Sequence, residues 1–521
     1  MSSEAVLAPV RPVGPDRLRA LVIAHPRLMA VLAFVCWSAL VLQLAVHHAV
    51  WRDEVRALSL AIDPATLSDM VAGLRGEGHP ILWYLLLRTS YFVFVSLFVL
   101  PAVSFFAAAA AIAFLFLRAP FPLIVRLLIA CSAFVVIEYA VVSRNYGIAM
   151  LPMFVFADRY DAWRRKGIGL GVLLFLLANT SVHAALAVIM FCGVWLVETL
   201  RENGLVWSRP LRVFLLNALV AAAGVLFAAW ITTGSANDTY SSRIAIHGFS
   251  AILTAILNPG EPFQALVPML PAFLLTMLLF GCLLLLLDRP ALCLGGLGAL
   301  LLMSLLFVIV YPGMYRHAAI WILVFVSLLW IAERRRSASA EQRVSVARRM
   351  GWGFLLVLLC LQVGSTIGIV IDLASRPWSH SRALASLLKS DPKLAGSIVL
   401  AEPDYLVEPL RYYGLERTWL PREDRFGNVV NFTRNARLDL DLGAILETAE
   451  RLRRENGREV VILLGTGLAD AATPAAGVKL GPNWTFSATA EQILAFGACT
   501  ERLASFKGAM TDEDYSVYRL R

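Results

Sequence analysis

An acidic pair directly after the first long apolar run is the strongest candidate for chemistry in this sequence. Residues 28–50 are apolar, and the next four residues are Trp51-Arg52-Asp53-Glu54. Adjacent side chains project about 100° apart on a helix. One carboxylate can therefore accept a proton as a general base, while the other takes a structural or metal-binding role. The alternative is a solvated pair in a loop, but the membrane edge favours a functional site.

Cationic side chains that suit an anion occur at the ends of later apolar runs. Arg144 lies in a short polar turn, and the pair Arg316-His317 opens another run. The planar fork of an arginine can bind a phosphate. A cationic pair at a helix start is unusual, because the helix dipole favours anions there. The alternative for Arg144 is an arginine that extends to the lipid headgroups.

Three further residues are candidates for substrate binding. His79 closes the first polar loop, residues 51–80, and Tyr146 follows Arg144 by two positions. His183 lies at the break between two apolar runs. A single histidine there is most often a packing residue, and Tyr146 is equally consistent with the aromatic belt at a membrane surface.

A membrane-embedded body must position these residues. The chain has 521 residues, of which 59% are hydrophobic and only 16% are charged, whereas soluble domains carry about 25% charged residues. A spanning helix needs about 20 apolar residues. We therefore predict a multi-pass α-helical membrane protein over residues 1–371 and a soluble α/β domain over residues 372–521. The predicted spans, about eleven in number, are 28–50, 98–117, 122–141, 146–158, 168–180, 182–199, 213–232, 267–287, 291–311, 318–332 and 351–371.

The distribution of Lys and Arg predicts the orientation of these spans. With the N-terminus in the cytoplasm, the arginines before residue 28 and the basic clusters within 159–166, 201–212 and 334–336 all lie inside. The candidate site residues then lie at the outer side, together with Arg243 and His247. The chain is predicted to be an inner-membrane protein whose C-terminal domain lies outside the cytoplasm.

Residues 80–97 are apolar, but counting them as a span would reverse the orientation of everything that follows. We therefore predict a helix that lies in or dips into the outer leaflet.

In the outer domain, alternating patterns predict strands at 397–401, 459–464, 498–507 and 513–519 and an amphipathic helix at 443–456.

Charge and cysteine usage exclude some partners. The net charge is +9, but the surplus lies in short loops between apolar runs, so we expect no nucleic-acid partner. The seven cysteines are not spaced like a metal site or a disulfide framework. The sequence predicts no specific cofactor. Asp53 and Glu54 alone are a poor cation site, so dependence on a divalent cation stays open.

The first loop resembles that of the GT-C glycosyltransferases, in the branch with protein O-mannosyltransferases and the aminoarabinose transferases of lipid A (glycosyltransferase family 39-like). The similar segments are Asp53-Glu54-Val55-Arg56, Ser59-Leu60-Ala61 and Gly78-His79-Pro80-Ile81-Leu82-Trp83-Tyr84. Arg144-Asn145-Tyr146 is similar to an Arg-x-Tyr turn of these families, although Val142 replaces a frequent acidic residue. Relatives also usually have two prolines near His79-Pro80-Ile81. Asn179 to His183 resembles their Thr-His-containing span, and Tyr315-Arg316 resembles a late Arg-Tyr pair in reversed order.

This resemblance implies transfer of a sugar from a polyprenyl-phosphate donor to a lipid, glycan or protein acceptor at the outer face of the membrane. Asp53 would be the general base of an inverting reaction, and Glu54 would orient the acceptor or share a divalent ion. Arg144, Arg316 and His317 would bind the donor phosphate. His79, Tyr146 and His183 would contact the substrates.

A polytopic transporter or lipid flippase is the alternative. Such proteins place ionisable groups near the membrane midplane on broken helices, with inverted repeats, and the sequence contains no recognisable repeat. A structural scaffold would explain the outer domain but not the clustered charges.

The predicted sidedness can be tested with Cys499, the single cysteine of the C-terminal domain. A membrane-impermeant maleimide should label Cys499 in intact spheroplasts, after mild denaturant if the thiol is covered. Cys499→Ser is the control and should lose this label. Labelling of the loosened domain only after the membrane is breached would reverse the orientation.

Overall fold

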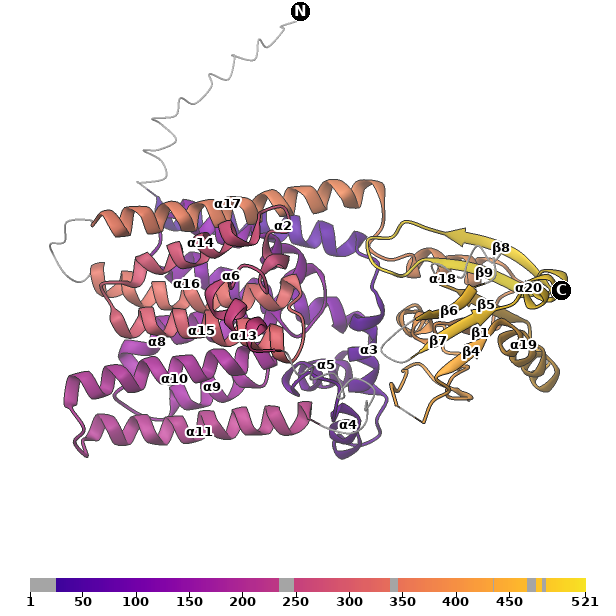
Figure 1. Ribbon diagram of the computed structural model, residues 1–521, viewed down its shortest axis with the longest axis horizontal. Helices are drawn as coiled ribbons and strands as arrows, with labels where there is room; N and C mark the ends of the chain where they lie inside the picture. The colour runs from indigo at the N-terminus through magenta and orange to yellow at the C-terminus, as the bar shows by residue number, and fades with distance from the viewer. Residues whose placement is uncertain (1–24, 234–247, 338–344, 434, 466–474, 480–483) are drawn as a thin grey trace, which may run out of the picture.

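The chain folds into a helical bundle with a sheet domain at one end (Figure 1). The computed structural model describes residues 25–233, 248–337, 345–433, 435–465, 475–479 and 484–521. We call the end of the bundle where α2 (Pro26–His47) ends and α16 (Tyr315–Ser337) begins the domain-facing end. The arginines before residue 25, Arg243 and His247 lie outside the described residues.

Seven of the described helices are long and apolar enough to cross a membrane. They are α2, α6 (Val99–Arg118), α10 (Val182–Asn203), α11 (Arg209–Thr232), α15 (Pro290–Ile309), α16 and α17 (Val346–Ser375). The consecutive helices α7 (Leu123–Ala130) and η1 (Phe134–Val141) are bent by 49° and count as an eighth if they form one span. The chain is therefore a multi-pass α-helical membrane protein.

Three of the predicted spans are shorter helices. They are α8 (Met150–Trp163), α9 (Gly169–Ala178), and α14 (Ala272–Leu283) with its continuation η4 (Leu284–Leu286). Each is shorter than the roughly 20 residues that a perpendicular crossing needs. The number of about eleven spans therefore stays a prediction. The remaining described helices of the bundle are η2 (Gly147–Ala149), α13 (Phe249–Leu257) and η3 (Gln264–Leu266).

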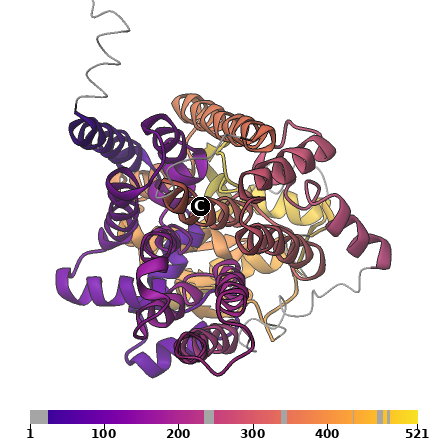
Figure 2. The ribbon, with the colours of Figure 1, turned by 90° about the vertical axis from the view of Figure 1, so that its left-hand side faces the viewer.

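Helix α16 is the central helix of the bundle. Of its most apolar 18-residue window, 89% is buried, compared with at most 56% for the other candidate spans. A helix that is apolar on every face is typically buried on every face by its neighbours. Residues 318–332 of α16 contain no charged side chain. Figure 2, which looks along the bundle, shows many of the helices nearly end on. Since α16 begins at Tyr315, Arg316 and His317 lie in its first turn, at the domain-facing end.

Three short helices lie between the bundle and the sheet domain (Figure 1): α3 (Arg52–Ile62), α4 (Leu67–Leu74) and α5 (Leu82–Phe94). Helix α5 corresponds to the apolar segment 80–97 and has only 13 residues. Its Arg88 is buried and donates hydrogen bonds to the carbonyl oxygens of Ala61 (2.8 Å) and Pro64 (2.9 Å). Arg88 thus satisfies carbonyl groups at the C-terminal end of α3, which fixes α3 against α5.

The C-terminal domain is built on a mixed six-stranded sheet in the order β3-β2-β1-β5-β9-β8. Its strands are β1 (Ile398–Glu402), β2 (Thr418–Leu420), β3 (Arg425–Phe426), β5 (Val460–Leu464), β8 (Thr500–Phe506) and β9 (Tyr515–Leu520). Strand β1 is parallel to β2 and β5, whereas β9 runs antiparallel to β5 and β8. The four predicted strands are confirmed. A second sheet contains β4 (Asp439–Asp441), β7 (Thr485–Ala488) and β6 (Ala475–Lys479).

Helices cover both faces of the main sheet. Ile398 and Leu400 pack in one cluster with α19 (Leu442–Asn456), and α20 (Ala490–Cys499) joins the same cluster. Val399 and Ala401 pack with α18 (Ser381–Ser390) and the 3₁₀ helix η5 (Asp404–Tyr413). Successive strand residues point to opposite faces, so the fully buried β1 separates two apolar cores. This is the predicted α/β domain, although α17 continues to Ser375, beyond the predicted boundary at residue 371. Cys499 is exposed.

Candidate functional site

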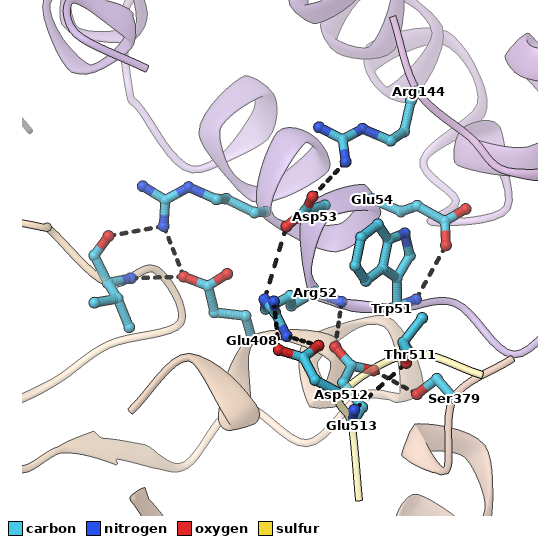
Figure 3. A network of polar contacts seen from close by, with 12 residues as sticks. Trp51, Arg52, Asp53, Glu54, Arg144, Ser379, Glu408, Thr511, Asp512 and Glu513 are labelled. Carbon is cyan, nitrogen blue, oxygen red and sulfur yellow. Dashed lines mark hydrogen bonds and ion pairs between the residues drawn. The ribbon is translucent and has the colours of Figure 1, made fainter. Parts of the chain in front are cut away.

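Asp53 forms an ion pair at the domain-facing end of the bundle. Helix α3 begins at Arg52, so Asp53 lies in its first turn, where the helix dipole favours an anion. Its Oδ2 accepts a hydrogen bond from Nη1 of Arg144 (Figure 3). Nε of Arg52 lies 3.8 Å from Oδ1. The Asp53 side chain is 28% exposed, so the carboxylate is both ion-paired and accessible to a ligand.

The surrounding arginines determine the ionisation of Asp53. Burial alone would raise the pKa of the Asp53 carboxyl, but the charges of Arg144, Arg52 and Arg316 outweigh burial. Together they hold this pKa well below its usual range. Asp53 is therefore an anion at neutral pH, and it is a weak base as long as these arginines face it.

Glu54 has a different environment. It is fully buried, and its Oε2 is hydrogen-bonded to Nε2 of His48 (2.8 Å) and to the backbone N–H of Trp51 (3.0 Å). Its Oε1 accepts the backbone N–H of Ser143 (2.7 Å). Figure 3 shows Glu54 pointing away from Asp53. Of the two roles that the sequence left open for this carboxylate, the structural one matches these contacts.

Metal binding was one of the open questions for the acidic pair. The described part of the chain contains no group of three or more His, Cys, Asp or Glu side chains placed to hold a metal ion. Since Glu54 uses both oxygens for hydrogen bonds within the protein, these two carboxylates do not converge on one point.

Arg144 connects Asp53 to His79. It is buried, and its Nη2 lies 3.3 Å from Nε2 of His79. A guanidinium group has donors but no hydrogen-bond acceptor atom. His79 therefore accepts this hydrogen bond through an unprotonated nitrogen. Burial and the charge of Arg144 lower the pKa of His79 to about 3, which keeps the ring neutral. Arg144 thus contacts the Asp53 anion on one side and the neutral ring of His79 on the other.

Arg316 approaches the same aromatic rings as Arg144. Its guanidinium carbon lies 6.0 Å from the ring centres of Trp51 and of Tyr146. The corresponding distance from Arg144 is 5.7 Å for both rings. The fold therefore places two guanidinium groups, one from the turn before η2 and one from the first turn of α16, around two shared aromatic side chains. Such contacts stabilise a cation without neutralising it.

The other histidines form a stacked pair beside Tyr146. Nε2 of His317 lies 2.8 Å from the Tyr146 hydroxyl, and its Nδ1 accepts the backbone N–H of Met314 (3.1 Å). Both nitrogens are therefore engaged, so in this structure His317 orients Tyr146 and presents no free nitrogen to a phosphate. The rings of His183 and His317 stack with centres 4.6 Å apart.

Four buried polar atoms around these side chains have no hydrogen-bond partner among the described residues. They are Nε1 of Trp51, Oγ of Ser143, Nδ1 of His183 and Nε of Arg316. Buried polar atoms are nearly always paired in native proteins, and exceptions call for a functional explanation. Trp51 contacts the guanidinium groups of Arg144 and Arg316, Ser143 precedes Arg144 in the chain, and His183 stacks on His317, so these atoms are candidates for contacts with a polar ligand.

Glu138 is a further acidic residue near Arg144 and Arg316 that no motif in the sequence marks. This half-buried residue lies on η1, a π-helix of the bent pair, and it interacts electrostatically with Arg316 and Arg144. Single turns of π-helix are frequent at functional sites. An acidic residue inside the predicted span 122–141 was the available signal, because such residues are costly in a membrane. The roles of His48 and Arg52 are likewise not marked in the sequence, since neither residue has a spacing that identifies its partner.

Neither a protein-family model nor a curated protein matches this chain. The site combines an accessible carboxylate, two guanidinium groups and several unpaired polar atoms, which suits proton transfer beside a bound anion.

The different environments of the two acidic residues predict different effects on stability. Glu54→Ala should lower the free energy of unfolding by about 3–5 kcal/mol, because it leaves buried hydrogen-bonding groups without a partner. Asp53→Ala should cost less, since Asp53 is partly exposed and Arg144 keeps its contact with His79. Thermal unfolding of the purified variants in detergent measures this difference. Equal midpoints, or a lower midpoint for Asp53→Ala, would contradict the structural role of Glu54.

Proposed function

We propose that this chain is a GT-C-like glycosyltransferase with about eleven spans, a cytoplasmic N-terminus and an outer C-terminal domain. It transfers a sugar from a polyprenyl-phosphate donor to a lipid, glycan or protein acceptor at the outer face of the cytoplasmic membrane. The observation that carries this proposal is the Asp53–Arg144 pair, with Arg316 beside it and four unpaired buried polar atoms around it. The resemblance of the first loop supports it.

The proposed reaction is a single displacement at the anomeric carbon. The acceptor hydroxyl oxygen forms a bond to this carbon while the bond from the carbon to the phosphate oxygen breaks. Polyprenyl phosphate leaves with the electron pair, and Asp53 accepts the hydroxyl proton. A base is required because the pKa of a hydroxyl group lies far above neutral. Attack opposite the leaving group inverts the anomeric centre.

Two arginines suit the donor phosphate. Its lipid tail partitions into the bilayer, so the phosphate lies near the membrane surface, and charge-assisted hydrogen bonds to guanidinium groups are strong. Arg144 already binds Asp53, so an incoming phosphate competes with this carboxylate. As Arg144 turns to the phosphate, the pKa of Asp53 rises toward its usual range. Donor binding thereby makes Asp53 a stronger base, which predicts that the donor binds before the acceptor reacts.

A transporter or lipid flippase remains the second candidate, because one observation favours it. Helices α7 and η1 are bent by 49°, and the second carries Glu138. Ionisable residues on broken helices are typical of transporters. Sugar release from a labelled polyprenyl-phosphate donor, dependent on an acceptor, separates an enzyme from a transporter.

The role of Asp53 is tested by Asp53→Asn, which keeps the shape and removes the proton acceptor. We expect kcat to fall by about 10²–10⁴, while donor binding persists because a charge that repels phosphate is lost. Steady-state transfer with the labelled donor measures kcat, and a separate binding assay measures donor affinity. Near-normal turnover by a folded Asp53→Asn protein would refute the general-base assignment.

The roles of Arg144 and Arg316 are tested by alanine substitution of each. A lost charge-assisted hydrogen bond costs about 1.5–3 kcal/mol, so the KM for the donor should rise roughly ten- to a hundredfold, with a smaller change for the acceptor. Arg75→Ala is the matched control, because Arg75 is an exposed arginine of the first loop that stacks on Trp230 at 5.1 Å. Its donor KM should not change. Equal donor KM values in all three variants would remove the phosphate-binding role.

A further inference from the structure

The sheet domain holds the start of the helix that carries Asp53. The backbone N–H of Arg52 donates a hydrogen bond to Oε1 of Glu513 (2.6 Å) (Figure 3). The first N–H groups of a helix have no partner within the helix. Trp51, the residue before α3, makes no capping hydrogen bond through its own side chain. The side chain of Glu513, 461 positions further along the chain, therefore caps α3.

Arg52 lies between an acid of the sheet domain and Asp53. Its Nη1 and Nη2 donate to the two carboxylate oxygens of Asp512 at 2.5 and 2.9 Å. Its Nε is 3.8 Å from Asp53, and its guanidinium carbon is 4.4 Å from the ring centre of Tyr405. The contacts with Asp512 and Tyr405 thus prevent the guanidinium group of Arg52 from hydrogen-bonding to Asp53. Arg144 therefore remains the hydrogen-bonded partner of Asp53.

A second contact reinforces this arrangement one helical turn later. Nη1 of Arg56 donates to Oε1 of Glu408 and to the carbonyl oxygen of Val430, both at 2.7 Å. Side chains four positions apart share a helix face, so Arg52 and Arg56 bind the sheet domain through one face of α3. Asp53 projects from a different face, toward Arg144.

We propose that Asp512 and Glu513 are positioning residues for Asp53 and that the sheet domain serves to hold the first turn of α3. Glu513 orients the turn, and Asp512 keeps Arg52 from binding Asp53 directly. The kinetic consequences rest on the proposed function, whereas the effect on the reactivity of the Asp53 carboxyl does not.

The main test is Asp512→Asn, with Asp63→Asn as the matched control. Asp63 follows the C-terminal end of α3 and forms an ion pair with Arg411 of the sheet domain, so it joins the same two parts of the protein at the other end of the helix. Asp512→Asn should lower kcat about tenfold with a donor KM within about twofold of the wild type. Asp63→Asn should leave both values within about twofold. Equal losses in the two variants would assign both pairs to general docking and overturn the proposal.

The second readout needs no enzymatic activity. A carbodiimide modifies protonated carboxyl groups, and mass spectrometry of the full-length protein measures its rate at Asp53. In Asp512→Asn, the released Arg52 should bind Asp53 and lower its pKa further, which should slow modification at least about threefold at a low pH where part of Asp53 is protonated. Asp63→Asn should show the wild-type rate. An unchanged rate in Asp512→Asn would refute the proposal.

A double variant tests whether Asp512 acts through Arg52. In the Arg52→Gln background, Asp512→Asn should cause no further change in kcat or in the rate of modification, because residues that act through one contact are not additive. Additive losses would overturn the proposal. If the wild type transfers no sugar but the modification rates follow the expected order, the proposed function fails and the positioning role stands.

Glu513 provides an independent comparison. It is fully buried, and burial raises its pKa to about 8 against the opposing effects of Arg52 and the Ser379 hydroxyl. Glu513→Gln keeps the oxygen that accepts the N–H of Arg52 and should retain the wild-type kcat and modification rate. Glu513→Ala removes this oxygen and should lower kcat about tenfold. Equal behaviour of the two variants would remove Glu513 from the proposal.

Discussion

The carboxylate of Asp53 must stay ionised at the end of a helical bundle, and the surrounding structure depends on how its charge is balanced. Arg144 binds it directly, Arg52 lies 3.8 Å away, and Arg316 adds a further positive charge. These arginines come from three separate elements. Their convergence requires that α3, the turn before η2 and the start of α16 meet at one point. The domain-facing end of the bundle is that point.

Adjacent carboxylates perform different tasks here because a helix separates their side chains. Glu54 turns inward, where His48, Trp51 and Ser143 occupy its oxygens. It thereby joins α3 to the turn that carries Arg144. Asp53 turns toward the arginines and keeps part of its surface accessible. Glu54 helps to position the partner of Asp53, since its contact with Ser143 places the next residue, Arg144, beside Asp53.

The sheet domain completes this arrangement from the other side. Its acids Asp512, Glu513 and Glu408 bind α3 through Arg52 and Arg56. Two arginines on one face of a short amphipathic helix suit an acidic partner, and the sheet domain supplies it. The short helix thus lies between an apolar bundle and a soluble domain, with a separate face for each. This explains why its sequence mixes buried apolar residues with four charged residues in its first five positions.

Local sequence patterns were sufficient to predict the classes of structure and the candidate chemistry. Long apolar runs predicted the membrane helices, alternating residues predicted the strands of the sheet domain, and the acidic pair predicted one carboxylate for chemistry and one for a structural or metal-binding role. These inferences depend on local patterns of apolar residues, because any helix or strand that is buried needs apolar side chains at the positions that face its neighbours. The folded arrangement was needed to show that Glu54 is the structural acid, that Arg144 binds Asp53 and that Asp512 and Glu513 contact Arg52. Pairs separated by 91 or 461 positions leave no spacing in one sequence, because an ion pair depends on where the fold brings charges together and not on their distance along the chain.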